Sequence, residues 1–406
     1  MHQYGPNCEP MQTDYPEAKE NLSPHLRGRD LVTPMFSIQS TIRLERSFAV
    51  RRGQGNLSNE ISNGNDKRCD YQLISVVDEN GMAVDLFTVN LSPSVQDVIV
   101  TSAVGNEYFE RWKAFSFPTW KRYAHEHQLG IVVVLNRLIV GPESIAKNAS
   151  WDKLLAPLLL SQHFPKIERV ALLDTDVVIS PFAPNLFDLS EPGSYSVVSQ
   201  ERGLPFPIRE VRQRIALLRQ WFYDDDYPQN SILQATAEEV FSLQGLPAHP
   251  DYFCAGLIVL DSSLFEDLAN CHASISSDRA QSSFAWEEPF VNDWIQSRNH
   301  IWMPYEYQAI WLFEMAWYYP HLYGLVSNVP GNRAVADVIG SVMLNRFFLH
   351  FAGSWFEADA WKNILSDTFV FDAKFISRMS KLNSDPKPVE SFGKIAPSRK
   401  RGGGAL

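Results

Sequence analysis

The sequence predicts an α/β fold with a mixed, mainly parallel central sheet. Apolar, β-prone runs alternate with helical stretches between Asp97 and Leu173, in the order strand, helix, strand, helix, strand. This order is typical of parallel strands joined by crossover helices. A second buried run at residues 252–261 supplies a further strand. With 45% hydrophobic and 12% aromatic residues in 406, the chain has enough apolar side chains for a large core.

The N-terminal part is predicted to lie outside the main domain. Residues 1–65 are rich in Pro, Ser, Asn, Gly and charged residues, without a sustained hydrophobic period, and indicate a mobile or peripheral segment. Residues 66–95 indicate a β-hairpin extension, because two β-prone runs, 71–77 and 82–89, flank an Asn-Gly turn dipeptide. We expect this hairpin at an edge of the main domain.

The main domain is predicted at residues 96–380. Its expected strands lie at 98–102, 131–135, 169–173, 252–261, 301–305 and 347–353, and its expected helices at 106–127, 151–163, 207–222, 231–243 and 359–379. Residues 201–248 indicate a helical insertion. Residues 381–406 turn to Pro, Ser, Gly, Lys and Arg, which indicates a disordered basic tail.

Charge and cysteine content narrow the function class. A net charge of −11 argues against a general nucleic-acid-binding protein, because no basic excess is available to pair with phosphates. No apolar run approaches the length of a membrane span, so we expect no integral membrane segment. The four cysteines lack paired metal-ligand spacing and are too few for a disulfide framework. We therefore expect a reducing compartment and a cytoplasmic protein.

Two carboxylates, Asp174 and Asp176, follow the apolar run 170–173. Alternate side chains of an extended segment point the same way, so both could bind one divalent cation together with the phosphates of a substrate. His350, within the apolar run 347–353, is the candidate third ligand, and this set suits Mn²⁺ or Mg²⁺. The alternatives are acids that cap a turn after the strand, and a histidine that belongs to the core.

Further motifs follow these acids in a recognisable order. They are Phe253-Cys254-Ala255-Gly256 with a following apolar run, Glu287-Glu288-Pro289 leading to Asn292, and His350-Phe351-Ala352-Gly353. In this order the sequence resembles metal-dependent retaining glycosyltransferases of the Rossmann-like GT-A fold, over about residues 97–361. Family 8 members such as glycogenin, galactinol synthase and the lipopolysaccharide galactosyltransferases are of this kind, and family 34 is an alternative. The resemblance implies that Asp174, Asp176 and His350 hold a Mn²⁺ that binds the diphosphate of a nucleotide-sugar, most often a UDP-sugar.

The resemblance also implies a donor site. The positions that correspond to it are Ala103, Gly105, Tyr108, Lys153, Ala255, Gly256 and Gly353. Tyr108 corresponds to an aromatic that can stack on the base, although it could equally belong to the core. Lys153 matches a basic residue that faces the donor phosphates in relatives, whereas a lysine on a helix surface would be unremarkable. Ala255 and Gly256 would line the sugar and acceptor side.

Glu287 and Glu288 fall where family 8 enzymes usually show Asp-Gln before a helix. Retention requires either a front-face return through an ion pair or a nucleophile beneath the sugar ring. Glu288 could be that nucleophile, or could stabilise positive charge at the anomeric carbon. The alternative is that both acids are simply favoured at a helix N-terminus.

Three positions depart from the family pattern. Cys254 stands where relatives commonly have Asn, Gln308 stands where Asn is usual, and Phe356 lies near the place of an expected lysine. Arg346 or Lys362 could replace the phosphate contact of that lysine.

The sequence thus predicts a hexosyltransferase that moves a hexose from a nucleoside-diphosphate sugar to a carbohydrate or other hydroxyl acceptor, with retention. One alternative is a catalytically inactive glycosyltransferase-like module that binds carbohydrate, although such a module has no need of a metal that binds diphosphate. A haloacid dehalogenase-type phosphatase also has Asp-x-Asp on a hydrophobic strand. That family needs a later Gly-Asp, and the sequence contains no such dipeptide.

Overall fold

The structure is a computed structural model, and it describes residues 71–78, 81–222, 235–283, 286–322 and 333–352. The predictions for the N-terminal segment 1–65, the helix at 359–379 and the tail at 381–406 fall outside these residues.

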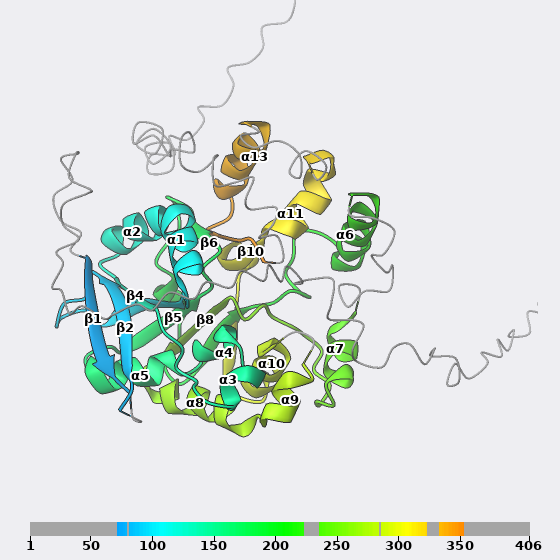
Figure 1. The fold of residues 1–406 in the computed structure, drawn as a ribbon. Helices are drawn as coiled ribbons and strands as arrows, with labels where there is room; N and C mark the ends of the chain where they lie inside the picture. Colours follow the sequence, from blue (N-terminus) through cyan, green and yellow to red (C-terminus); the bar gives the residue numbers. More distant parts are fainter. Residues whose placement is uncertain (1–70, 79–80, 223–234, 284–285, 323–332, 353–406) are drawn as a thin grey trace, which may run out of the picture. The chain divides into compact units, whose positions relative to one another are not determined.

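An eight-stranded mixed sheet forms the centre of the described fold (Figure 1), with the strand order β1-β2-β4-β3-β5-β8-β7-β9. Its strands are β1 (Tyr71–Val77), β2 (Ala83–Val89), β3 (Asp97–Ser102), β4 (Gly130–Val134), β5 (Arg169–Leu173), β7 (Tyr195–Val198), β8 (Leu257–Asp261) and β9 (His300–Met303). Only β2 and β8 run against the other six strands. The predicted α/β fold with a mixed, mainly parallel sheet is therefore confirmed.

The central strands are mainly apolar because both faces of the sheet are covered. On β5, Val170 and Leu172 pack into one core cluster, and Ala171 and Leu173 pack into another. This is the alternation that a pleated strand imposes. Figure 1 shows α1 and α2 over one face and α5 and α8 over the other.

The helices on the two faces and around the edges are short. Their bounds are α1 (Asn106–Phe115), α2 (Phe117–Glu126), α3 (Glu143–Ala146), α4 (Ala149–Asp152), α5 (Ala156–His163), α6 (Ile208–Phe222), α7 (Ala237–Leu243), α8 (Phe265–Ser274), α9 (Ser277–Gln281), α10 (Glu288–Gln296), α11 (Trp311–Tyr318) and α13 (Arg333–Met343). The insertion predicted at 201–248 includes α6 and α7.

Two of the predicted helices are interrupted. The helix expected at 106–127 is divided at Ser116, and Pro118 stands in the first turn of α2. The helix expected at 151–163 is divided between α4 and α5, and Pro157 stands in the first turn of α5. Proline has no N–H to donate and excludes the carbonyl of the preceding turn, so a new helix begins one residue before each of these prolines. The second interruption determines where Lys153 lies.

A second, three-stranded sheet has the order β10-β11-β6. Its strands are β6 (Val177–Ile179), β10 (Ala309–Ile310) and β11 (Phe348–His350). The β11 strand pairs antiparallel with β6 and parallel with β10. This sheet packs with α6, α11 and α13 in a separate core cluster.

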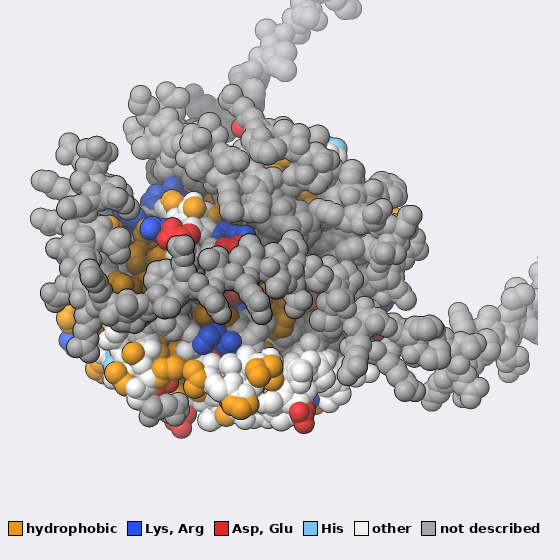
Figure 2. Space-filling model, in the orientation of Figure 1, with side chains coloured by type: hydrophobic (Ala, Val, Ile, Leu, Met, Phe, Trp, Pro, Cys, Tyr) orange, Lys and Arg blue, Asp and Glu red, His pale blue; other side chains and the backbone are white. Residues whose placement is uncertain are grey.

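The described surface on the face seen in Figure 2 mixes hydrophobic, polar and charged side chains. Among the helices of the described residues, none has the length and apolar character needed to cross a bilayer. The cysteines in the described ranges, Cys254 and Cys271, are both buried and free.

Candidate functional site

Asp174 and Asp176 lie at the junction between the two sheets. The β5 strand of the large sheet ends at Leu173, and β6 of the small sheet begins at Val177. Asp174 and Asp176 therefore flank the turn that joins the sheets, at the carboxyl end of a central strand. Ligands bind at this edge in open α/β sheets. Asp176 is buried, whereas Asp174 remains partly exposed.

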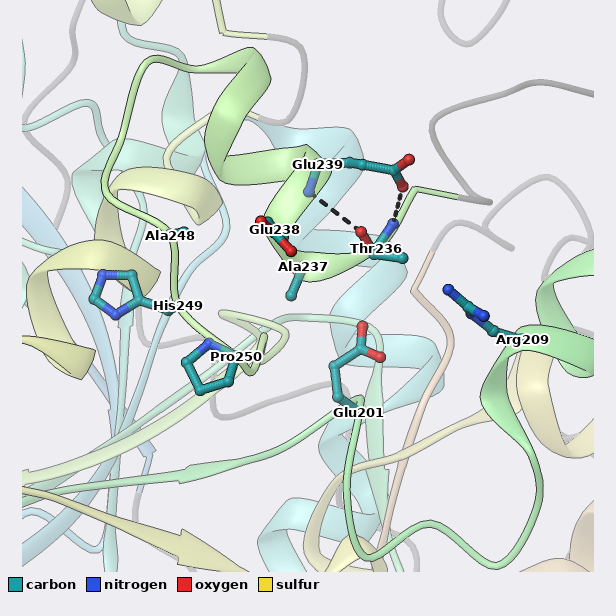
Figure 3. Close-up of a pocket in the computed structure, with 9 residues that line it drawn as sticks. All are labelled: Glu201, Arg209, Thr236, Ala237, Glu238, Glu239, Ala248, His249 and Pro250. Atoms are coloured by element: carbon teal, nitrogen blue, oxygen red, sulfur yellow. Dashed lines mark hydrogen bonds between the residues drawn. The ribbon is translucent and has the colours of Figure 1, made fainter. Parts of the chain in front are cut away.

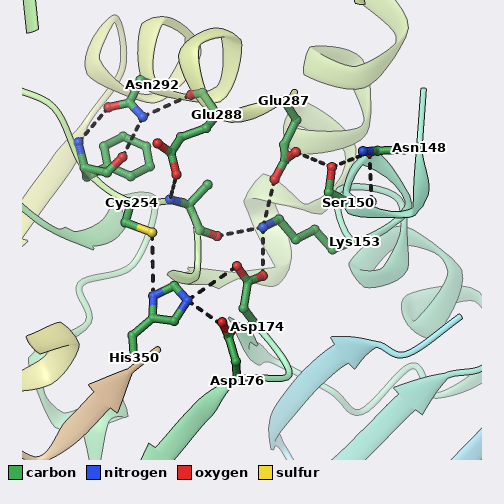
Figure 4. Close-up of polar contacts among 12 residues, drawn as sticks. Asn148, Ser150, Lys153, Asp174, Asp176, Cys254, Glu287, Glu288, Asn292 and His350 are labelled. Atoms are coloured by element: carbon green, nitrogen blue, oxygen red, sulfur yellow. Dashed lines mark hydrogen bonds and ion pairs between the residues drawn. The ribbon is translucent and has the colours of Figure 1, made fainter. Parts of the chain in front are cut away.

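His350 approaches the two aspartates from the small sheet. The register of β11 on β6 places His350 opposite Val177. Its Nε2 lies 3.1 Å from Oδ1 of Asp176 and 3.8 Å from Oδ2 of Asp174 (Figure 4). Each of the three residues offers one ligand atom within 4.8 Å of the other two. Residues far apart in the sequence thus converge on one point.

Gly256 makes room for this convergence. A Cβ at position 256 would lie 2.2 Å from Cε1 of His350 and 3.0 Å from Oδ2 of Asp174. Real Cβ atoms do not tolerate the first of these distances. Since the N–H of Asp174 also donates to the carbonyl of Gly256 at 3.0 Å, the backbone has little freedom to move away. A side chain at position 256 is therefore incompatible with the present place of the imidazole.

Lys153 is buried in the break between α4 and α5. Its Nζ lies 2.9 Å from Oδ1 of Asp174 and 2.9 Å from Oε1 of Glu287, and it donates to the carbonyl of Ala255 at 3.0 Å. Burial lowers the pKa of Lys153, but the two carboxylates outweigh burial and raise it above its usual range. Lys153 is therefore a charged, fully paired group within the site, and it does not lie on a helix surface.

The two predicted catalytic glutamates have different surroundings. Glu287 is buried, with one oxygen on Lys153 and the other accepting the hydroxyl of Ser150. Glu288 begins α10 and is partly exposed, and its Oε2 accepts the N–H of Ala255 at 3.1 Å. Burial raises the pKa of Glu288 above its usual value, partly opposed by that hydrogen bond. Only Glu288 combines partial exposure with a carboxylate that is not tied to a cation.

The other ring nitrogen of His350 points away from the carboxylates. Its Nδ1 lies 3.6 Å from Sγ of Cys254 and 3.3 Å from Nε2 of Gln308. Burial lowers the pKa of His350, but Asp176 outweighs burial, and the net shift is well above the usual value. Burial also raises the pKa of the Cys254 thiol to about 11, so this thiol is protonated at neutral pH.

Negative charge exceeds positive charge in this cluster. Asp174, Asp176 and Glu287 have three negative charges when ionised, whereas Lys153 has one positive charge and His350 at most one. A divalent cation would compensate the excess. Carboxylate oxygens with one imidazole also match the ligand preferences of Mn²⁺ and Mg²⁺. The residues present therefore fit such an ion.

The predicted donor loop follows β3, the parallel neighbour of β5. Ala103 is buried, and Gly105 has a φ of 92°, which favours glycine. Tyr108 is 53% exposed, so the alternative that it belongs to the core is wrong. The predicted position Gly353 lies outside the described residues.

One suggested substitute for the missing lysine, Arg346, is already paired with acids. Arg346 forms ion pairs with Glu314 at 2.7 Å and Glu306 at 3.5 Å, and its guanidinium lies over the ring of Tyr305. Its positive charge is therefore already compensated by these two acids. The other suggestion, Lys362, lies outside the described residues.

Sequence reasoning missed the contacts of Ser150, Cys254 and Gln308. Cys254 and Gln308 were singled out only as departures from a family pattern, and nothing in that pattern indicates that both face Nδ1 of His350. Only their positions could have indicated these contacts. Cys254 lies two residues before Gly256, which is next to His350, and Gln308 directly precedes β10, which pairs with the strand that contains His350.

A cavity of about 590 Å³ lies in the helical insertion (Figure 3). Its lining comes from the segment after β7, from the start of α6 and α7, and from the segment before β8. The residues are Glu201, Arg209, Thr236, Ala237, Glu238, Glu239, Ala248, His249 and Pro250. β5 and β7 run in the same direction with β8 between them, so the segment that follows β7 and the aspartates that follow β5 lie at the same edge of the sheet.

Two glycosyltransferases are among the solved structures that resemble the chain. One is a glycosyltransferase involved in the glycosylation of the major capsid of PBCV-1, with 11% identity over 65% of this chain and 98% of that chain, at a TM-score of 0.38. The other is the apo structure of the WbbM bifunctional glycosyltransferase, with 15% identity over 71% of this chain and 52% of that chain, at a TM-score of 0.36. No family model and no curated protein matches the sequence.

Proposed function

We propose that this protein is a glycosyltransferase that moves a hexose from a nucleoside-diphosphate sugar, of the UDP class, to a hydroxyl acceptor with retention. The proposal depends above all on one observation. Ligand atoms of Asp174, Asp176 and His350 lie within 4.8 Å of one another at the carboxyl end of a central strand. A diphosphate is negatively charged and can bind next to these carboxylates only together with a cation. The cluster has the ligands for one.

In this proposal Asp174, Asp176 and His350 hold Mn²⁺, or Mg²⁺ in its place. When bound, the ion supplies Lewis-acid stabilisation of the departing diphosphate. Lys153 pairs with Oδ1 of Asp174, whereas His350 faces Oδ2 of the same residue. Glu287, which accepts the hydroxyl of Ser150, pairs with Lys153 and keeps it in place.

Glu288 is the proposed group beneath the anomeric carbon. Its carboxylate is fixed by the N–H of Ala255, next to Gly256, whose carbonyl accepts the N–H of Asp174. From this place it can stabilise positive charge at that carbon, as an ion pair or by forming a bond to it. In the second case the bond from that carbon to the diphosphate breaks as the bond to the glutamate forms. The acceptor hydroxyl then displaces the glutamate and gives its proton to the released diphosphate, and two inversions give retention.

The proposal places the nucleotide of the donor and the acceptor at different parts of the structure. The nucleotide lies at the loop after β3, where the exposed Tyr108 can stack on the base. A carbohydrate or other hydroxyl acceptor enters the cavity between α6 and α7, whose carboxylates, guanidinium and imidazole can hydrogen-bond to hydroxyl groups. These assignments extend the metal cluster along one edge of the sheet.

Calorimetry of UDP with and without Mn²⁺ tests the proposal. We expect binding that needs Mn²⁺ in the wild type and in Asp188→Asn, a control on an exposed aspartate, and none in Asp176→Asn. UDP-sugars would then be screened for hydrolysis and transfer. Absence of UDP binding in every condition would contradict the proposed donor, and GDP would be tested next.

The same assay separates the alternatives. A binding module without turnover would show no nucleotide-sugar hydrolysis with Mn²⁺. A phosphatase would release inorganic phosphate from simple phosphate esters and would show no preference for a nucleotide-sugar.

A further inference from the structure

The imidazole of His350 can bind a metal ion through Nε2 only when that nitrogen has no proton. The proton of the neutral ring must then be on Nδ1, where a buried N–H needs an acceptor. Metal-bound histidines in proteins almost always have such a partner, which fixes the tautomer and the ring orientation. The residue that accepts from Nδ1 therefore decides whether Nε2 is available.

Gln308 has the acceptor that Nδ1 lacks. Its side chain is 2% exposed, and its Nε2 lies 3.3 Å from Nδ1 of His350. Its Oε1 is buried and has no hydrogen-bond partner among the described residues. A half-turn of the terminal amide exchanges these two atoms and brings the unpaired oxygen to Nδ1.

The amide nitrogen suits only one form of the ring. As a donor it can face an unprotonated Nδ1, which leaves the proton on Nε2, pointing at Asp176 3.1 Å away. With the amide turned, the oxygen accepts a proton on Nδ1 and the lone pair of Nε2 faces the aspartates. In a neutral ring this conversion moves the proton from Nε2 to Nδ1 and leaves the number of protons unchanged. In a charged ring Nδ1 already has its proton, and metal binding displaces the one on Nε2.

The alternative acceptor at Nδ1 is weaker. Sγ of Cys254 lies 3.6 Å from Nδ1, and a neutral thiol is a poor acceptor. The backbone also favours Gln308, which directly precedes β10. Since β10 pairs with β11 in a register that places Ile310 beside His350, Gln308 is held two residues from the strand partner of His350.

We propose that Gln308 is a positioning residue that selects the metal-binding tautomer of His350 by accepting the Nδ1 proton. This inference depends on the metal site of the proposed function. It adds a residue that does not bind the metal itself. It also predicts that Oε1 of Gln308 faces Nδ1 of His350 in the metal-bound protein.

Titration of wild type and variants with Mn²⁺ alone tests the inference, by calorimetry or by the electron paramagnetic resonance signal of free Mn²⁺. Gln308→Leu removes the acceptor at similar volume and is expected to weaken Mn²⁺ binding by about 10- to 100-fold. Gln308→Glu keeps an acceptor oxygen and is expected to bind within a few-fold of the wild type. The control Cys254→Ala, which removes the alternative acceptor, is also expected to stay within a few-fold.

A second measurement determines the tautomer in the wild-type protein itself. In ¹⁵N-histidine-labelled protein loaded with diamagnetic Mg²⁺, long-range proton–nitrogen correlations are expected to show the proton of His350 on Nδ1, with His350→Gln identifying its signals. A proton on Nε2 in the Mg²⁺-loaded wild type would overturn the inference.

The other outcomes are distinct. Wild-type Mn²⁺ affinity in Gln308→Leu, or a larger loss in Cys254→Ala than in Gln308→Leu, would overturn the role of Gln308 and leave the metal site intact. A wild type that binds neither Mn²⁺ nor Mg²⁺ would overturn the metal site and this inference together.

Discussion

Two buried lysines, six residues apart in the sequence, belong to clusters of the same residue types with different charge balance. Lys147 donates to Glu143 at 2.6 Å and to the carbonyl of His272 at 2.8 Å. Lys153 is shared by Asp174 and Glu287, with Asp176 and His350 beyond. We call the first set the Lys147 cluster and the second the Lys153 cluster.

In the Lys147 cluster one lysine meets one glutamate that is 45% exposed, and the charges cancel. Burial, with a smaller contribution from Lys147, lowers the pKa of His272 to about 4, so this histidine is a neutral core residue. In the Lys153 cluster the carboxylates exceed the cations, and the pKa of His350 is raised. The residue types alone do not distinguish a structural cluster from a candidate metal site, whereas the ratio of carboxylates to cations does.

The largest expected difference is in metal binding. Asp176→Asn is expected to abolish Mn²⁺-dependent UDP binding and turnover, because a ligand oxygen is lost. Glu143→Gln, the matched change in the Lys147 cluster, is expected to leave both unchanged. Calorimetry and a hydrolysis assay measure the two effects. Equal losses in the two variants would remove the distinction between the clusters.

Removal of each lysine tests the difference in stability. Lys153→Met leaves Glu287 buried without a counter-charge, and breaking a buried pair costs about 3 to 5 kcal/mol. Lys147→Met leaves Glu143 in contact with water and one carbonyl without its donor, at about 1 to 2 kcal/mol. Urea denaturation of the metal-free proteins gives both values, and a smaller loss in Lys153→Met than in Lys147→Met would contradict the comparison.

The two histidines predict opposite dependences of stability on pH in the metal-free protein. The pKa of His272 is lowered from 6.5 to about 4, so the unfolded chain binds more protons in this interval. Stability is therefore lost as the pH falls from 6.5 towards 4, by about 3 kcal/mol in total. The pKa of His350 is raised, so its pairing with Asp176 stabilises below pH 6.5, and this contribution is lost as the pH rises through the folded pKa.

Urea denaturation at a series of pH values measures both dependences. His272→Gln is expected to flatten the acidic side of the profile and His350→Gln the alkaline side. A steeper acidic side in His272→Gln would show that this histidine is charged in the folded protein.

The fold was largely predictable because hydrophobic runs determine the strands. The runs at β3, β4 and β5 are apolar on both faces, which only a covered sheet allows. Helix continuity was less predictable, since Pro118 and Pro157 each stand in the first turn of a new helix within a stretch whose apolar pattern continues. The small sheet was not predicted, because β10 is two residues long and leaves no periodic signal.

The candidate site was predictable where its chemistry is unusual in a strand. Acids and an imidazole in apolar runs indicated Asp174, Asp176 and His350. The partners of Lys153 were not predictable, because they depend on the break between α4 and α5 and on the packing of α10. The place of Gln308 depends on a register between short strands, and no local pattern encodes such a register.

The smallest predicted difference concerns two serines beside the lysines. The hydroxyl of Ser150 donates to buried Glu287, with Asn148 as its alternative acceptor, whereas Ser144 donates to the exposed carbonyl of Gly141. Hydrogen bonds to charged groups contribute more than those to neutral ones, so Ser150→Ala should cost about 1 to 2 kcal/mol and Ser144→Ala less than about 0.5 kcal/mol. Urea denaturation of the metal-free variants measures both. Mn²⁺ affinity should be unchanged in Ser150→Ala, because Glu287 supports Lys153 without being a ligand. A clear loss of affinity in this variant would show that Glu287 belongs to the metal site. The difference between the two clusters would then include Lys153, which pairs with Glu287.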